Sequence, residues 1–236
     1  MRTLKAIVGA LFVASLTSAT AGDITGVVKL KGTPPPEKPL PLDPACGKLW
    51  PNEKPKTRLY VVGADGGLAD TFVYLKKADA KAPGATLPPA LLDQKGCEYT
   101  PYIMGLQTGQ KLLVRNSDPL LHNVHGTPKI NKEFTLAQMA GGKDIERSFD
   151  QQEVMVRFKC DVHVWMFAYI GVVPHSYFAV TDKDGKFAIK GVPSGKYEVA
   201  AFHRKAHGTD DKAVVQAVTV GDGAAQANFT VEVPPQ

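Results

Sequence analysis

The stretch Glu153–Val173, EVMVRFKCDVHVWMFAYIGVV, contains two strand-like runs joined by a short loop that is rich in possible metal ligands. Cys160, His163 and Met166 follow one another at three-residue spacing and offer a thiolate, an imidazole and a thioether. Each of these side chains can bind a soft transition metal. The stretch therefore predicts a β-hairpin whose loop carries a metal site.

The rest of the chain repeats the strand pattern. Strand-like runs such as ITGVVKL, TFVYLK, KLLVRN, YFAVT and KYEVAAF are separated by turn residues, as in DKDGK and VPSGK. Many short strands with regular turn signals are typical of β-sandwiches and barrels, so we expect an all-β protein. Only EFTLAQMAGG, residues 133–142, offers a possible short helix.

The N-terminus resembles an export signal. Arg2 and Lys5 precede the apolar run 6–16, and small residues follow as far as Ala21. This pattern predicts a secretory signal peptide over residues 1–21, and hence a periplasmic or secreted mature protein. The apolar run is too short to cross a bilayer and no second long one follows, so we expect no membrane span.

The net charge excludes some classes of partner. Loss of residues 1–21 removes two basic residues and no acidic one, so the net charge falls from +5 to +3. The remaining excess is mild and spread along the chain. It favours neither nucleic acid nor an anionic membrane surface.

The chain has three cysteines, and an exported protein tends to pair them. Cys46 and Cys97 lie in turn-rich settings, whereas Cys160 belongs to the ligand pattern. We therefore expect a Cys46–Cys97 disulfide and a Cys160 thiol that is free to bind metal. The motif C-x-x-C-H does not occur in the sequence, which excludes a covalently attached haem of that type.

A fourth ligand candidate lies upstream, in RNSDPLLHNVHGTP. Two strands between His122 and Cys160 could bring the two segments side by side. Two histidines, one cysteine and a weak axial methionine describe a blue-copper electron-transfer site. A structural zinc site would more often have four Cys or His ligands and no methionine. The expected cofactor is one type 1 copper held by His122, Cys160, His163 and Met166.

The same residues resemble a known family. HNVH followed by C-x-x-H-x-x-M is similar to the amicyanin-like cupredoxins, over about Pro88 to Val173. The resemblance implies a Greek-key β-sandwich and the same four copper ligands. It also implies that His163 lies at the surface in an apolar patch, for which Leu120, Leu121 and Trp165 are the candidates. Where the family has prolines around the second histidine, this chain has Val162 and Val164.

The remaining chain resembles a carboxypeptidase-regulatory, or transthyretin-like, sandwich. Its turn motifs occur in YFAVTDKDGKFAIKGVPSGKYEVAAFH, and its opening strands occur at the N-terminus as ITGVVKLKGTPPP and TFVYLKK. We therefore expect the cupredoxin domain, 88–175, to be inserted into or docked on a second small sandwich. That sandwich would combine the strands of 22–87 with the C-terminal region 176–236.

Four histidines lie outside the ligand set. His125 is three residues from His122, so on a strand it should point to the opposite face. A second metal site built from His175, His203 and His207 is a minor alternative. The DKDGK motif has acidic residues at Asp182 and Asp184, but its spacing does not match an EF-hand loop, and a hairpin turn is expected instead.

These patterns predict a type 1 copper protein that carries single electrons and catalyses no bond chemistry. The resemblance to amicyanin implies a role in amine (methylamine) oxidation, with a dehydrogenase and a c-type cytochrome as redox partners. The alternative is a copper carrier or an adhesive binding module without a redox role. An exposed methionine-rich site would favour the carrier, and the chain has only five methionines without a cluster. A copper enzyme would need further histidine-rich sites.

Overall fold

A computed structural model describes residues 21–77, 85–207 and 212–234. Nearly all of the regular structure is β, which confirms the predicted fold class. The predicted signal peptide lies outside the described residues except for Ala21, which begins strand β1. In the described part of the chain, no helix is long and apolar enough to cross a bilayer.

Strands from the two ends of the chain form one pair of sheets, called here the terminal sandwich. Its first sheet has the order β13-β1-β16, with β17 also paired to β1. The bounds are β1 Ala21–Lys31, β13 Lys186–Pro193, β16 Ala225–Gln226 and β17 Phe229–Glu232. The second sheet has the order β12-β2-β14-β15. Its bounds are β2 Thr71–Leu75, β12 Phe178–Val180, β14 Gly195–His203 and β15 Val214–Val220.

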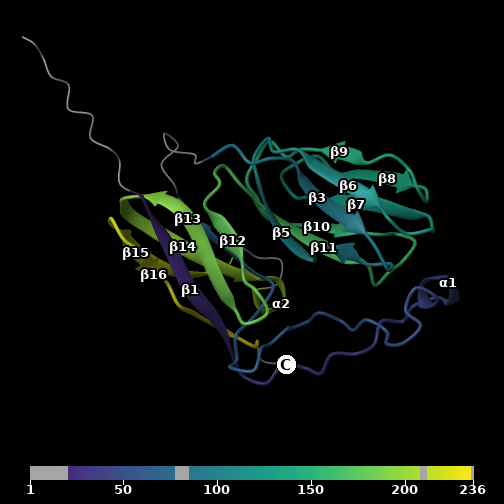
Figure 1. Cartoon of the computed structure of the whole chain (residues 1–236), viewed down its shortest axis with the longest axis horizontal. Helices are drawn as coiled ribbons and strands as arrows, with labels where there is room; N and C mark the ends of the chain where they lie inside the picture. Colours follow the sequence, from purple (N-terminus) through teal and green to yellow (C-terminus); the bar gives the residue numbers. More distant parts are fainter. Residues whose placement is uncertain (1–20, 78–84, 208–211, 235–236) are drawn as a thin grey trace, which may run out of the picture.

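The nine strands between β2 and β12 form the second pair of sheets, called here the central sandwich (Figure 1). One sheet has the order β5-β11-β10-β7-β8 and the other β4-β3-β6-β9. The bounds of the first sheet are β5 Ile103–Gln107, β7 His122–Thr127, β8 Phe134–Gln138, β10 Glu153–Lys159 and β11 Phe167–Val173. Those of the second sheet are β3 Ala90–Gln94, β4 Tyr99–Thr100, β6 Leu112–Asn116 and β9 Ile145–Arg147.

Each sandwich has its own apolar core. The buried cluster of the terminal sandwich includes Ile24, Val28, Leu75 and Val199. The cluster of the central sandwich includes both Cys160 and Met166. Because alternate residues of each strand face inward, the apolar residues predicted from the strand pattern fill these cores.

A third, smaller cluster joins the two sandwiches. Phe72 from β2 packs against Ile103 and Val173 of the central sandwich. A Cβ atom at Gly171 would lie 2.4 Å from the Phe72 ring, so the two sandwiches meet in close contact there. The contact holds the central sandwich against the β12-β2-β14-β15 sheet.

The prediction of a possible helix over residues 133–142 is wrong, because this segment contains a strand. It contains β8, which pairs with β7 from His122↔Gln138 to Gly126↔Phe134. The described helices are single turns elsewhere, α1 at Pro44–Gly47 and α2 at Arg204–His207. Alternate residues of β8 are more and less exposed, which is the burial pattern of a strand.

The loop between β1 and β2 crosses the end of the central sandwich and carries α1 (Figure 1). We call residues 40–50 of this loop the strap. The base of the strap is closed by a hydrogen bond from the Leu40 backbone N–H to the Pro55 carbonyl at 2.8 Å. The Glu37 carboxylate also accepts from the backbone N–H groups of Leu59 and Tyr60, so both sides of the loop are held together.

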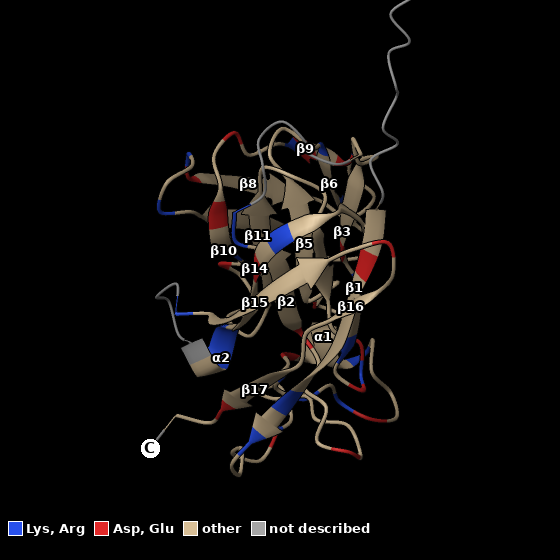
Figure 2. Ribbon diagram, turned by 90° about the vertical axis from the view of Figure 1, so that its left-hand side faces the viewer, with Lys and Arg blue, Asp and Glu red and all other residues tan. Residues whose placement is uncertain are grey.

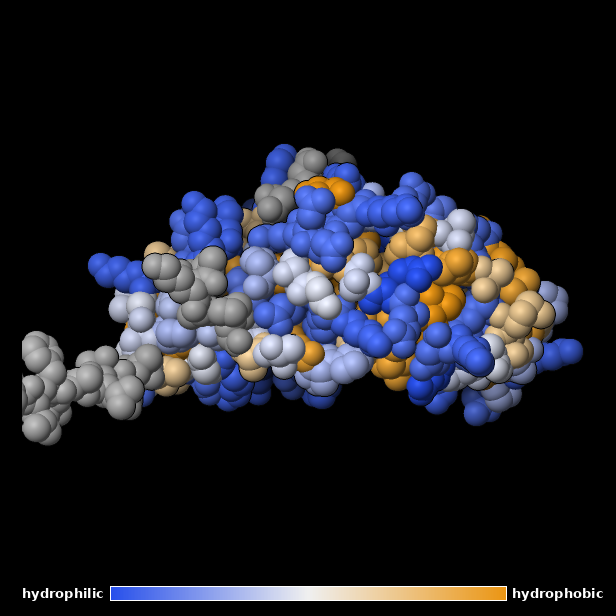
Figure 3. Space-filling model, turned by 90° about the horizontal axis from the view of Figure 1, so that it is seen from above, coloured by the Kyte–Doolittle hydropathy of each residue, from blue (hydrophilic) through white to orange (hydrophobic). Residues whose placement is uncertain are grey.

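Charged and apolar residues are distributed differently over the surface. Basic and acidic residues are interspersed on the side seen in Figure 2. Figure 3 shows exposed apolar residues mainly over the part of the molecule that holds the central sandwich. The large exposed apolar residues of that sandwich are Leu91, Leu121, Ile130, Met139, Val162 and Val164.

Candidate metal centre

Two strand pairings bring the predicted ligands together. β10 and β11 pair up to Lys159↔Phe167, so residues 160–166 form the loop of a hairpin, as predicted. Backbone hydrogen bonds from Cys160 N–H to the Met166 carbonyl, 3.1 Å, and from Met166 N–H to the His163 carbonyl, 2.9 Å, close this loop. β7 pairs with the other edge of β10, which places His122 beside the loop.

The ligand atoms of His122, Cys160 and His163 all lie within 4.8 Å of one another. The two histidines face each other through Nδ1, at 2.9 Å, and Cys160 Sγ lies 3.6 Å from His163 Nδ1. All three side chains are buried. Met166 is also buried and belongs to the same core cluster as Cys160.

This arrangement fits a metal ion. Nitrogen and sulfur ligands lie about 2.0 and 2.3 Å from a metal such as zinc, so two ligand atoms on one ion are roughly 3–4 Å apart. The observed separations of 2.9 and 3.6 Å are close to that range. A donor set of two imidazoles and one thiol, next to a thioether, is the set that type 1 copper prefers.

Hydrogen bonds prepare Cys160 to act as a thiolate. Burial opposes ionisation of the thiol, but a hydrogen bond with His122 and backbone N–H donors from Asn123, His163 and Val162 outweigh it and lower the pKa. The Asn123 backbone nitrogen lies 3.5 Å from the sulfur. The thiolate is the form of cysteine that binds metal.

The Asp118 carboxylate contacts His122 at Nε2, the ring nitrogen that does not face His163. Its Oδ2 lies 2.8 Å from His122 Nε2, and both residues are buried. Burial alone would lower the pKa of His122, but the hydrogen bonds to Asp118 and Cys160 raise it to about 9. The Asp118 carboxylate also accepts from the backbone N–H groups of Gly96, 2.6 Å, and Cys97, 2.7 Å. The carboxylate therefore fixes the ring so that Nδ1 faces Cys160 and His163.

Asp118→Asn is expected to weaken copper binding by about 10–100-fold, which is the usual cost of losing a partner that orients a metal-binding histidine. The amide keeps the size of the side chain but removes its charge, and it can no longer accept from all three donors. The measurement is a competition titration against a chelator of known copper affinity.

Asp144→Asn is the matched control for that titration. Asp144 forms an ion pair with Arg115 at 2.8 Å, near the surface of the same sandwich and away from the ligands. Its variant should bind copper like the parent protein. Equal affinities for the Asp118 and Asp144 variants would show that the contact to His122 does not support the site.

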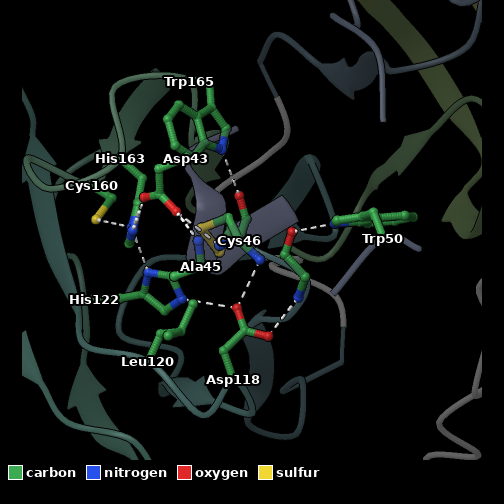
Figure 4. Close-up of a disulfide and its surroundings, with 12 residues drawn as sticks. Asp43, Ala45, Cys46, Trp50, Asp118, Leu120, His122, Cys160, His163 and Trp165 are labelled. Carbon is green, nitrogen blue, oxygen red and sulfur yellow. Dashed lines mark hydrogen bonds and ion pairs between the residues drawn. A yellow bond between two sulfur atoms is a disulfide. The ribbon is translucent and has the colours of Figure 1, made fainter. Parts of the chain in front are cut away.

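The strap covers the outer side of His163 (Figure 4). The His163 side chain is buried, with only 5% of its surface exposed. Its Nε2 lies 3.5 Å from Asp43 Oδ2 on the strap. The sulfur atoms of Cys46 and Cys97 and a ring nitrogen of His163 lie within 4.8 Å of one another. Burial lowers the pKa of His163, and the nearby His122 lowers it further.

The prediction that His163 lies at the surface is therefore wrong. The Pro-rich loop between β1 and β2 folds over the position where the resemblance implied an exposed edge. Of the proposed patch, Leu121 is 42% exposed, whereas Leu120 and Trp165 are half-buried. The most exposed apolar residues of the ligand loop are Val162, at 54%, and Val164, at 71%.

The predicted cysteine pairing is confirmed. Cys46 and Cys97 form a disulfide, and Cys160 is a free, buried cysteine. The disulfide attaches the strap to the turn at Gly96, where the Trp50 indole N–H also donates to the Gly96 carbonyl at 2.8 Å. Because Asp118 binds the same turn, the strap and His122 are linked through one hydrogen-bonded network. Asp118 was not predicted from the sequence, although this acidic residue lies only four residues before His122.

The other histidines do not form a described second site. His125 lies on the opposite, half-exposed face of β7, as predicted, between Asp161 and Glu133 at 2.7 Å each. His175 contacts the Leu75 carbonyl at 3.0 Å, and the ring of His203 stacks on Tyr60. The side chain of His207 lies outside the described residues. Within those residues, the clusters of metal-binding atoms all lie around His122 and His163.

The DKDGK motif forms a turn, but the expected hairpin is wrong, because the strands that the turn joins belong to different sheets. Asp182 Oδ1 accepts from the backbone N–H groups of Asp184 and Lys186, both at 2.9 Å. The turn connects β12 to β13. Its first carboxylate is thus used to hold the backbone.

Comparisons with known proteins give a partial likeness of fold. Neither a protein-family profile nor a curated protein sequence matches the chain. A copper-containing nitrite reductase from Thermus scotoductus SA-01 aligns over 42% of this chain and 27% of its own, with 17% identity and a TM-score of 0.33. The Cu(I) form of an amicyanin mutant aligns over 42% of this chain and 97% of its own, with 15% identity and a TM-score of 0.32. The oxidised state of another amicyanin mutant gives the same coverage and TM-score with 16% identity. These are likenesses, over less than half of the chain, to solved structures of copper proteins.

Proposed function

We propose that this chain is a type 1 copper protein that carries single electrons between redox partners. The observation that supports the proposal is the buried convergence of two imidazole Nδ1 atoms and one thiol at the end of a β-hairpin. A copper ion bound there would accept and release one electron. No bond in a substrate needs to form or break, so the proposed protein is not an enzyme.

Each ligand has a separate task in this proposal. His122, Cys160 and His163 would hold the ion, and Met166 would be a fourth, weaker ligand. The strand pair around the loop would keep these ligands in similar positions in both oxidation states. The structural rearrangement that accompanies electron transfer is then small.

Burial of the centre argues against the alternative of a copper carrier. A carrier must release its metal to a partner, which favours ligands at the surface. Here the three ligands are buried, and the strap covers His163. A site that is closed in this way suits a resident ion better than a transferred one.

Sequence patterns support a location and redox partners for the proposed electron-transfer protein. The signal-like N-terminus and the disulfide support a periplasmic or secreted location. A c-type cytochrome and a dehydrogenase of amine (methylamine) oxidation are the partners implied by the amicyanin resemblance. We also propose a cupredoxin domain over 88–175, inserted into a transthyretin-like sandwich built from 22–87 and 176–236. The pairing of β1 with β13, and of β2 with β12 and β14, supports this division.

The visible and electron paramagnetic resonance spectra of the Cu(II)-loaded mature protein test the proposal. The parent protein should show the intense colour of thiolate-to-Cu(II) charge transfer with one copper per chain. Cys160→Ser should abolish this colour because the thiolate is lost. Met166→Leu should keep the copper and the colour, with a changed potential.

His125→Gln is the control variant. His125 lies on the outer face of the same strand as His122, so its loss should leave the colour intact. A parent protein that binds one equivalent of Cu(II) without the colour would overturn the assignment of the type 1 site.

A further inference from the structure

A cavity of about 150 Å³ lies where the central sandwich, the terminal sandwich and the loop that carries the strap meet. Leu40 and Leu59 line it from the loop, Tyr99, Trp165 and Met166 from the central sandwich, and Arg204 from the terminal sandwich. Binding sites often form at such junctions, and a cavity of this volume holds one benzene-sized ring.

The apolar end of the cavity adjoins the candidate metal centre. Trp165 and Met166 belong to the loop that carries Cys160 and His163, and both contribute to the cavity wall. The Trp165 indole N–H donates to the Cys97 carbonyl at 3.1 Å, so this ring has a fixed position. A ring in the cavity would contact Met166, the proposed axial ligand.

Arg204 supplies a positive charge at the cavity. Its Nε donates to the Tyr102 hydroxyl at 2.9 Å, and its guanidinium lies 4.5 Å from the centre of the Tyr169 ring. These contacts hold the half-buried side chain in place. In the described part of the chain, no carboxylate lies within ion-pair distance of it.

The two other cations in the cavity lining have ion-pair partners. Arg58 pairs with Asp70 at 2.8 Å, and Lys56 pairs with Glu53 at 3.1 Å. Glu98 is the acidic residue in the lining, and burial raises its pKa. Among the described residues that line the cavity, Arg204 is therefore the cation without an ion-pair partner. A guanidinium group can bind a carboxylate through paired hydrogen bonds.

We propose that this cavity binds a single-ring aromatic carboxylate, with its carboxylate on Arg204 and its ring against Trp165 and Met166. The volume favours one ring, and the aromatic wall favours a planar apolar group. The guanidinium, which has no ion-pair partner among the described residues, favours a negative charge. The site itself is independent of metal. Its effect on copper through Met166 rests on the proposed function.

Calorimetric titration of the metal-free mature protein with benzoate tests the site. Benzoate should bind saturably with one equivalent per chain, whereas benzylammonium, which has the same ring and the opposite charge, should not. Arg204→Gln should weaken benzoate binding at least about tenfold, because a charge-assisted hydrogen bond is lost. Lys205→Gln, at the exposed neighbouring position of α2, should bind benzoate like the parent protein.

Failure to bind benzoate, or equal binding by the two variants, would overturn the site even if the protein is blue. Benzoate should also shift the visible spectrum of the copper-loaded protein. Binding without such a shift would overturn contact with Met166. A colourless copper-loaded protein that still binds benzoate through Arg204 would retain the site and overturn the proposed function instead.

Discussion

Replacing both Cys46 and Cys97 with alanine is expected to expose His163 and to lower the free energy of unfolding by about 4 kcal/mol. The stability loss follows from the chain-entropy model for a bridge between residues 51 positions apart. The exposure follows from the location of the bridge. It is the covalent link between the strap and the turn beside Asp118, and without it the strap is held by non-covalent contacts alone.

Two of the remaining contacts of the strap are weak. The Asp43 side chain that faces His163 Nε2 is 41% exposed, so water competes for the contact. The Trp50 indole bond to Gly96 is a single neutral hydrogen bond, which contributes about 1 kcal/mol. If only about 1.4 kcal/mol of the disulfide contribution is lost from the closed strap, the open population rises about tenfold.

The rate at which a chelator removes copper from the folded protein measures this opening. The double-alanine variant should lose copper about ten times faster than the parent protein, under conditions where both are folded. Ile189→Ala is the control for general destabilisation, because it opens a hole in the core of the terminal sandwich at a cost of roughly 2–5 kcal/mol. Copper loss from the disulfide variant at the rate of this control would contradict the role of the strap.

Local patterns in the sequence predicted much of the candidate centre. The hairpin that carries Cys160, His163 and Met166 is formed by adjacent strands, so its strand pattern and loop spacing lie within one stretch of chain. The pairing of Cys46 with Cys97 followed from the assignment of Cys160 to the metal. The opposite orientations of His122 and His125 followed from the two-residue period of a strand.

Contacts between distant segments could not be predicted in this way. Asp43 and His163 are far apart in the sequence, and the Pro-rich loop that carries Asp43 has no periodicity to indicate which surface it covers. The resemblance to small cupredoxins implied an exposed edge because it did not extend to the loop between β1 and β2. The burial of His163 is thus a consequence of chain outside the region of resemblance.

The misassigned helix has a different cause. Residues 133–142 contain Leu, Ala, Gln and Met, which have high helix propensity. In the structure, five of these residues pair with β7, and the hydrogen bonds and side-chain contacts of the sheet decide the conformation. Helix propensity did not decide the conformation of this segment. The edge of β7, the strand that carries His122, offers backbone hydrogen-bonding groups with which the segment pairs.

Val162→Pro is expected to lower the reduction potential of the copper by a few tens to roughly 100 mV. The backbone N–H of Val162 is one of the donors to the Cys160 sulfur, together with those of Asn123 and His163. Such donors withdraw electron density from the thiolate and so tune the potential of the metal. Electron donation from the thiolate stabilises Cu(II) more than Cu(I). Each hydrogen-bond donor to the sulfur weakens this donation and therefore favours the reduced state.

Proline has no N–H, so the variant loses one donor and the oxidised state becomes relatively more stable. A hydrogen bond to a charged group contributes about 1.5–3 kcal/mol, and only the difference between the two oxidation states changes the potential. A tenfold change in a one-electron equilibrium corresponds to about 59 mV, which sets the expected size of the shift. Voltammetry on the parent and variant proteins, with the blue colour preserved in both, gives the measurement.

Val162→Ala separates the amide from the side chain. Alanine keeps the N–H but removes most of a side chain that is 54% exposed, so its potential should stay within about 20 mV of the parent value, a change of roughly twofold in the equilibrium. A proline variant with an unchanged or higher potential would show that the Val162 amide does not act on the thiolate. Equal shifts in both variants would assign the effect to solvent access at the loop. A drop confined to proline would identify the amide as the group through which this loop, with valine in place of proline, raises the potential of the centre.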